Sequence, residues 1–318
     1  MATNTLLKVR CWFFLLLPIL LTSSCDKPGD FEIKIPAPSL FISSNFKDKS
    51  AIEVEVSKVT LKFLEETDVE SVTNAKVTVF EGENFLEELD LVMPVGPRAL
   101  PKYTTKNLNP QNGKEYVIEV KVDGFKTVRA RSVIPSRVGI RNFSIGAVTK
   151  SFNPLENNVV YNFPVYISYN DPSSETNYYH LKIAQQIYEF KVVEGDTINY
   201  GSLLRSIGFG PDNDNNYVNA YFAGGVLLQD DPFGGQYVFK METEIDPSHQ
   251  RLGQLFLELR TVSEDYYRFH NSLDHQNQQV GGTGGFEESI TPYYNVENGN
   301  GIFAGYTQVL DSTLVEIQ

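Results

Sequence analysis

Histidine side chains are the natural starting point for a search for chemistry, because they bind metals and move protons near neutral pH. The sequence has four, His180, His249, His270 and His275. On a helix, His270 and His275 would lie about 140° apart and could not point at one ion. His270 and Asp274 could share an ion, but two ligands do not complete a zinc site. We therefore predict a solvated polar face here and no metal site.

Two acidic segments have the composition of calcium loops, GPDNDNN at 210–216 and LQDDPFGG at 228–235. The first has Asp, Asp and Asn at the first three ligand positions of an EF-hand loop. Tyr217 stands where that loop needs glycine, and Ala223 where it needs a bidentate glutamate, so the motif fails. Asp, Asn, Gly and Pro together are typical of ordinary turns. We predict turns, with an irregular calcium loop as the alternative.

Nucleophilic and nucleotide-dependent chemistry have equally little support in the sequence. No serine lies in a G-x-S-x-G elbow, and YGSLL at 200–204 lacks the second glycine. NGNGIFAG at 298–305 has a glycine spacing like that of a nucleotide loop, but the sequence before it has no convincing strand pattern and the sequence after it has no helical period. Its glycines instead predict a tight turn. Carboxylates are abundant, yet nothing marks two of them as a pair. We predict no catalytic residue, no cofactor and no enzyme.

The first 24 residues have the order of a secretory signal: Lys8 and Arg10, an apolar run over 11–21, and then small polar residues. At about 1.5 Å per residue the run is too short to cross a bilayer core of about 30 Å. LTSSC, ending at Cys25, resembles a bacterial lipoprotein lipobox, although Thr22 stands where leucine is usual. We predict a signal peptide over 1–24, with Cys25 as the lipidated residue. Several acyl chains would anchor the protein stably.

The charge balance of the 318-residue chain limits its partners. Its formal net charge is -13 and its pI about 4.8, which argues against binding to nucleic acid, because such affinity comes mainly from Lys and Arg. Only Cys25 would remain after the signal is removed, so no disulfide is expected. We predict a membrane partner through the lipid and no nucleic acid.

Alternating apolar and polar residues dominate the rest of the chain and predict a mainly β protein. A charged, proline-containing stretch at 25–37 favours a lipidated tether. We expect an immunoglobulin-like or transthyretin-like sandwich over 38–136 and a larger β-rich domain over 137–318. Pro135 and Gly139 break the pattern between these two domains.

One helix is expected near residues 263–279. Ser263 can cap it, and Glu264 and Arg268 form an i,i+4 pair. We expect the last residues, from GIFAGYTQVLD to TLVEI, to form a hairpin or strand pair.

Paired tyrosines recur at 178–179, 266–267 and 293–294. Neighbours on a strand face opposite sides, so a pair on a strand would have one ring in the core and one facing outward. Packing explains such pairs most simply. The alternative is that the outward rings of the C-terminal domain form a recognition surface for a peptide, glycan or protein.

Several segments in their order along the chain carry a resemblance. The lipobox, NAKVTVFEG, KEYVIEVKVDGFKTVRARSVIP, NYYHLKI, LELRTVSEDYYRFHNSLDHQ and NVENGNGIFAGY together resemble the domain-of-unknown-function family 4249, lipoproteins of Bacteroidota. The resemblance implies a lipid-anchored outer-membrane protein, often surface-facing and encoded beside a TonB-dependent receptor. It transfers no catalytic or ligand residue.

From these observations we expect a lipid-anchored outer-membrane protein, facing the exterior, that acts as a non-enzymatic binding or accessory component of a TonB-dependent transporter. The alternative is an adhesin-like or structural envelope protein without a small-molecule ligand.

Overall fold

The computed structural model describes residues 36–61, 67–96, 99–207, 218–222, 224–229, 235–281 and 291–315, with only the backbone described for 218–222 and 277–281. The predicted signal peptide, Cys25 and nearly all of the predicted tether lie outside these residues. So do the acidic loop 210–216 and most of 228–235. The predictions for those segments stay predictions.

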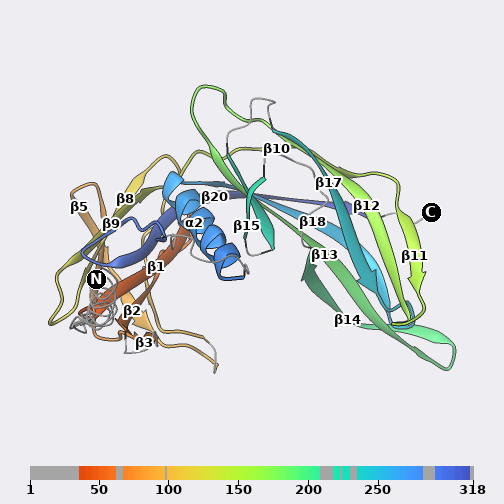
Figure 1. Ribbon diagram of the computed structural model, residues 1–318, viewed down its shortest axis with the longest axis horizontal. Coiled ribbons are helices and arrows are strands. Elements are labelled where there is room, and N and C mark those ends of the chain that lie inside the picture. The colour runs from red at the N-terminus through yellow and green to blue at the C-terminus, as the bar shows by residue number, and fades with distance from the viewer. Residues whose placement is uncertain are drawn as a thin grey trace, which may run out of the picture. The chain divides into compact units, whose positions relative to one another are not determined.

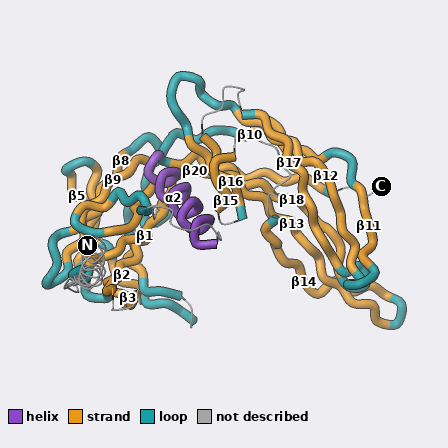
Figure 2. The backbone as a smooth tube through the Cα atoms, in the orientation of Figure 1, coloured by secondary structure: helices purple, strands orange, loops and turns teal. Residues whose placement is uncertain are grey.

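The described chain is mainly β with one helix, which confirms the predicted β-rich, sandwich-like fold (Figures 1 and 2). The largest sheet has eleven strands in the order β15-β16-β13-β18-β20-β1-β2-β7-β6, with β14 beside β13 and β3 beside β2. Its strands are β1 (Ser39–Lys47), β2 (Glu53–Leu61), β3 (Thr67–Ser71), β6 (Asp90–Val92), β7 (Lys102–Thr104), β13 (Tyr178–Val193), β14 (Asp196–Ser206), β15 (Val218–Phe222), β16 (Gly225–Gln229), β18 (Gln250–Val262) and β20 (Asn300–Leu314).

Two smaller sheets accompany the large one. The five-stranded sheet has the order β19-β9-β8-β4-β5, and the four-stranded sheet has β12 between β17 on one edge and β10 and β11 on the other. Their strands are β4 (Lys76–Glu81), β5 (Asn84–Glu88), β8 (Glu115–Lys121), β9 (Val128–Val133) and β19 (Val296–Glu297), and β10 (Ile140–Ile145), β11 (Thr149–Asn153), β12 (Asn158–Tyr169) and β17 (Gln236–Ile245).

The N-terminal core lies between the five-stranded sheet and the β1–β2 part of the large sheet. In the segment AIEVEVSKVTLKF, Ile52, Val54 and Val56 alternate with polar residues and are all buried in this core, whereas Leu61 further along the strand is exposed. They meet buried side chains from β4, β8 and β9 on the facing sheet. Burying one aliphatic side chain contributes about 1.5 to 3 kcal/mol, so this period-two pattern determines which face of each strand turns inward.

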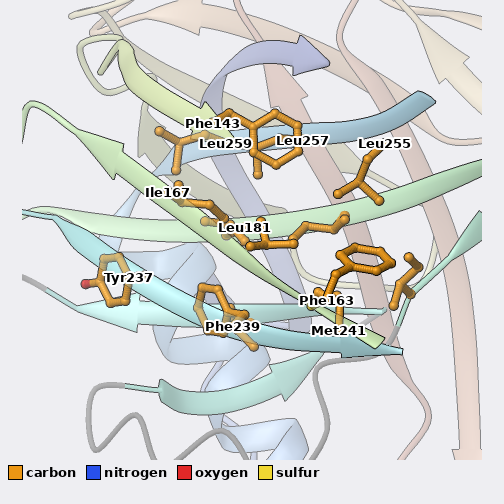
Figure 3. Close-up of a cluster of buried hydrophobic side chains, with 14 of the residues drawn as sticks. Phe143, Phe163, Ile167, Leu181, Tyr237, Phe239, Met241, Leu255, Leu257 and Leu259 are labelled. Carbon is orange, nitrogen blue, oxygen red and sulfur yellow. The ribbon is translucent and has the colours of Figure 1, made fainter. Parts of the chain in front are cut away.

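A second core lies between the four-stranded sheet and the β13–β18 part of the large sheet (Figure 3). Its side chains from β12 and β17 include Phe163 and Phe239, which face Leu181 of β13 and Leu257 of β18. Phe163, Phe239 and Leu257 alternate along their strands with outward, more exposed residues. The larger β-rich region is therefore also built from two packed sheets.

Strand β20 belongs to both halves of the large sheet. Its residues 300–306 pair in parallel with β1, and residues 306–314 pair antiparallel with β18. Phe303 inserts into the N-terminal core and stacks on Phe46 with ring centroids 4.3 Å apart. The predicted terminal hairpin or strand pair is wrong, because residues 300–314 form a single continuous strand that pairs with both β1 and β18. The predicted boundary between 136 and 137 falls between β9 and β10 and stays a prediction.

The predicted helix near residues 263–279 is confirmed as α2 (Glu264–Gly281). Ser263 Oγ accepts a hydrogen bond from Tyr266 N over 3.3 Å, as an N-cap should, and Glu264 pairs with Arg268 over 2.5 Å. Its buried residues Tyr266, Phe269 and His270 follow the helical period and face the large sheet.

Candidate functional site

The site that we consider lies on the face of the large sheet opposite the second core. On β13, Tyr179, Leu181 and Ile183 point into that core, so His180 and Lys182 point to the other face. On β18 the same alternation places Glu258 and Arg260 on this face. Because His180 pairs with Arg260 and Lys182 with Glu258, the four side chains form two adjacent cross-strand rows.

Helix α2 covers one end of this face. Tyr266, Tyr267 and Phe269 pack against Val262 of β18 and Ile302 of β20 in an apolar cluster, and Tyr178 joins it from β13. The His180–Arg260 row comes next along the strands, and the Lys182–Glu258 row follows. The charged side chains therefore begin where the apolar contact between helix and sheet ends.

A chain of polar contacts links the helix to these strands. Arg260 Nη1 donates to Tyr266 Oη over 3.3 Å, and His180 Nδ1 lies 2.8 Å from the same hydroxyl. Since arginine can only donate, the Tyr266 hydroxyl oxygen accepts from Arg260, and its own hydrogen is then available to His180 Nδ1. Arg260 Nε donates to Glu258 Oε1 over 2.7 Å, and its guanidinium lies 4.6 Å from the Tyr306 ring centroid.

Gln308 of β20 also contacts the Glu258 carboxylate. With the Gln308 amide oriented so that both of its polar atoms find partners, its nitrogen donates to Glu258 Oε1 over 3.1 Å, and its oxygen accepts from Lys47 Nζ over 2.9 Å. Glu258 Oε1 is therefore already engaged by both Arg260 and Gln308.

Burial controls the protonation of the aromatic side chains on α2. It raises the pKa of the Tyr266 hydroxyl to about 12, against the opposing effect of Arg260. It lowers the pKa of His270 to about 3, and the positive charges of Arg260 and Lys182 lower it further. Near neutral pH both side chains are uncharged.

Lys182 differs from the other cations of the site. Burial, and then the charge of Arg260, lower its pKa, while Glu258 acts in the opposite direction. Its side chain is half-buried, yet no hydrogen bond or ion pair joins it to another residue in the described parts of the chain. The carboxylate that faces Lys182 across the strands is Glu258, and it forms an ion pair with Arg260 instead.

The structure brings two of the four sequence-predicted histidines together. His180 and His270 both pack against the Tyr266 ring, with centroids 5.8 Å and 4.4 Å away. The solvated face predicted for His270 is wrong, because this residue lies on the buried side of α2 and is only 4 % exposed. His275 is exposed, and His249 pairs with Asp246 in the turn before β18.

Sequence reasoning missed Lys182, Glu258 and Arg260. The available signal was that each lies two residues from another polar side chain on a strand whose alternate positions are apolar. Among the described residues no group of three or more His, Cys, Asp or Glu side chains is arranged to hold a metal.

The tyrosine pairs are used mainly for packing: Tyr179 lies in the second core, and the other five rings lie around α2. Tyr178 and Tyr267 have ring centroids 4.7 Å apart, and Tyr293 and Tyr294 pack against the same apolar cluster. Tyr293 also donates its hydroxyl hydrogen to Asp265 Oδ1 over 2.7 Å. These contacts favour the packing interpretation over a tyrosine recognition surface.

Two cavities lie away from α2. One of about 880 Å³ is lined by the end of β10, the loop that follows it, Gln254 and the end of β20. The other, of about 420 Å³, lies beside the end of β1 and the middle of β20, and Lys47, Arg137 and Gln308 are among its lining residues.

Fold and site together define a β-rich, sandwich-like protein with a charged cluster at the margin of its helix. A family model described as Domain of unknown function (DUF4249) matches residues 26–311, so the chain belongs to that family. No curated protein matches the sequence. In the part of the chain that is described, no helix is long and apolar enough to span a membrane.

Proposed function

We propose that this protein is a Bacteroidota lipoprotein that is anchored to the outer membrane through Cys25 and faces the exterior. We further propose that it is a non-enzymatic binding or accessory component of a TonB-dependent transporter. The sequence LTSSC after a basic and apolar leader supports the anchor, and membership of the family is consistent with it.

The observation that carries the binding role is the charged cluster at the margin of α2. Lys182 and Arg260 are held by neighbouring strands of a sheet that is packed on its other face, so their separation is restricted by the fold. Side chains on rigid strands are suited to recognition because little freedom is lost when a ligand binds.

The protonation states of Tyr266 and His270 support a role in binding over catalysis for these two side chains. Tyr266, with a pKa of about 12, keeps its proton near neutral pH, and His270, with a pKa of about 3, stays unprotonated. A general acid or base works best with a pKa near the working pH, and neither group meets that condition.

A structural or adhesin-like role is the second candidate, and a different surface favours it. The hairpin of β13 and β14 exposes several large apolar side chains, namely Val192, Val193, Ile198, Tyr200 and Leu204. Exposed apolar groups of this kind are common where proteins bind one another.

Membrane fractionation tests the anchor. The full-length protein is expected in the detergent-soluble membrane fraction, and Cys25→Ala is expected in the aqueous fraction, because the acyl chains are lost. Retention of Cys25→Ala in the membrane would contradict the anchor.

Co-purification tests the partner. A tagged full-length chain, solubilised from the outer membrane in mild detergent, should recover a TonB-dependent transporter. Recovery of envelope proteins without a transporter would favour the structural role instead.

A further inference from the structure

We propose that Lys182 and Arg260 bind an anionic group, a carboxylate or a phosphate, at the margin of helix α2. This inference deepens the proposed binding role by naming the chemistry of the ligand. It depends on that role, but not on the lipid anchor or on the transporter.

The first argument is local charge. Lys182 and Arg260 lie in adjacent cross-strand rows, and the carboxylate that faces them is Glu258. Lys47 adds a further positive charge next to Gln308. The chain as a whole has a formal net charge of -13, so a local excess of positive charge runs against its composition. Such an excess favours an anion at this place.

The second argument is the cost of the arrangement without a ligand. Half-burying an ammonium group beside a guanidinium disfavours its charged form, both through lost hydration and through repulsion. The negative charge of Glu258 is shared between Lys182 and Arg260, because its Oε1 already accepts hydrogen bonds from Arg260 and Gln308. Glu258 therefore offsets only part of the cost at Lys182. A bound anion would supply the acceptor that Lys182 has not found among the described residues.

The third argument is geometric. Nε and Nη1 of Arg260 are occupied by Glu258 and Tyr266, and the Tyr306 ring holds the face of the guanidinium. These contacts fix the orientation of Arg260. Its Nη2 has no hydrogen-bond partner among the described residues and remains available to a ligand. An oriented guanidinium beside a lysine is a common way to recognise carboxylate and phosphate groups.

The test is a titration of the full chain, purified in non-ionic detergent, with inorganic phosphate and with acetate at constant ionic strength. Histidine side-chain NMR signals report binding, because His270 lies close enough to both cations for their charges to lower its pKa. Saturable shifts are expected for the His270 signals at pH 7, where both anions are charged, because the bound anion offsets the two positive charges near the ring.

Variants assign the effect to the site. Lys182→Met, which keeps the apolar stem, should weaken the affinity for the anion about tenfold, as expected for the loss of one charge-assisted hydrogen bond. Lys182→Arg should restore part of it. Lys191→Met is the matched control, since Lys191 is an exposed lysine on the same strand, and it should bind like the unchanged protein.

A second arm distinguishes a free anion from a lipid headgroup. The same proteins, each carrying Cys25→Ala so that no acyl chain binds the bilayer, are mixed with vesicles of phosphatidylcholine alone or with added phosphatidylglycerol. Binding that requires phosphatidylglycerol and Lys182 would identify a headgroup, and binding of soluble anions alone would identify a free ligand. The proposal is overturned if neither arm shows saturable binding, or if Lys182→Met and Lys191→Met bind equally well. Neither result bears on the Cys25 anchor.

Discussion

A Cβ atom at position 301 would lie 1.9 Å from the carbonyl oxygen of Ile42, so only glycine fits where β20 meets β1. Gly301 also has a φ of +112°, a conformation that side chains rarely adopt. The two constraints act together, because the parallel pairing places the two backbones side by side.

We expect Gly301→Ala to lower the free energy of unfolding by at least about 2 kcal/mol, from backbone strain together with the clash against Ile42. Urea unfolding measures the change. Gly139→Ala is the control, because a Cβ there meets open space and its φ is ordinary. Equal stability of the two variants would contradict the close approach.

The side-chain amide of Asn295 pairs with the backbone of Phe303 as a neighbouring strand would. Its Oδ1 accepts from Phe303 N over 3.0 Å, and its Nδ2 donates to Phe303 O over 2.8 Å and to Arg131 O over 3.1 Å. Asn295→Asp keeps the acceptor but turns the donor into a second oxygen that faces carbonyl groups. We expect a loss of about 1 to 3 kcal/mol, measured by urea unfolding at pH 7. Unchanged stability would show that these contacts contribute little.

The Ser263 cap can be removed without disturbing the apolar face of α2. Ser263→Ala deletes the acceptor for Tyr266 N and for Ser132 Oγ, and we expect a cost of about 1 to 2 kcal/mol. Ser263→Thr should retain most of the stability, because threonine also caps. Ser202→Ala, an exposed serine on β14, serves as the control and should change little. Thermal and urea unfolding should agree on this order.

Burial of His270 makes stability depend on pH. Its pKa is about 3 in the folded protein and about 6.5 in an unfolded chain, so between these values the unfolded state binds more protons. The contribution of His270 to stability is therefore full above about pH 6.5 and is lost as the pH falls toward 3, by up to about 1.4 kcal/mol per pH unit. Lowering the pH from 6.5 to 5 should thus cost about 2 kcal/mol from this residue.

Replacing the residue tests that dependence. His270→Gln should flatten the decline in stability between pH 6.5 and 5, whatever its effect at pH 7. His275→Gln should leave the decline unchanged, because His275 is exposed. If both variants keep the slope of the unchanged protein, the neutral state of buried His270 is not its cause.

Local patterns in the sequence were sufficient for some of the individual elements. The alternation of Ile52, Val54 and Val56 identified both the strand and its inward face. Ser263 identified the start of the helix, which the structure places one residue later at Glu264. Both signals are short-range, since they depend on side chains within one strand or one turn.

The same patterns wrongly predicted that His270 is solvated, because a tertiary contact determines its burial. Its spacing from His275 and Asp274 described the helix correctly, but it did not say which side of α2 would face the sheet. Tyr266 and Phe269 decide that orientation by packing on Val262 and Ile302, and they carry His270 into the buried face with them.

The amino-acid sequence by itself determined that the chain is a mainly β protein with one helix near residues 263–279, because residue periodicity and capping are local properties. Only the tertiary structure decided that β20 joins β1 to β18, and that Lys182, Glu258 and Arg260 meet beside α2. Those relationships depend on strand partners and register, which arise from packing between distant segments and leave no mark at any fixed spacing in the sequence.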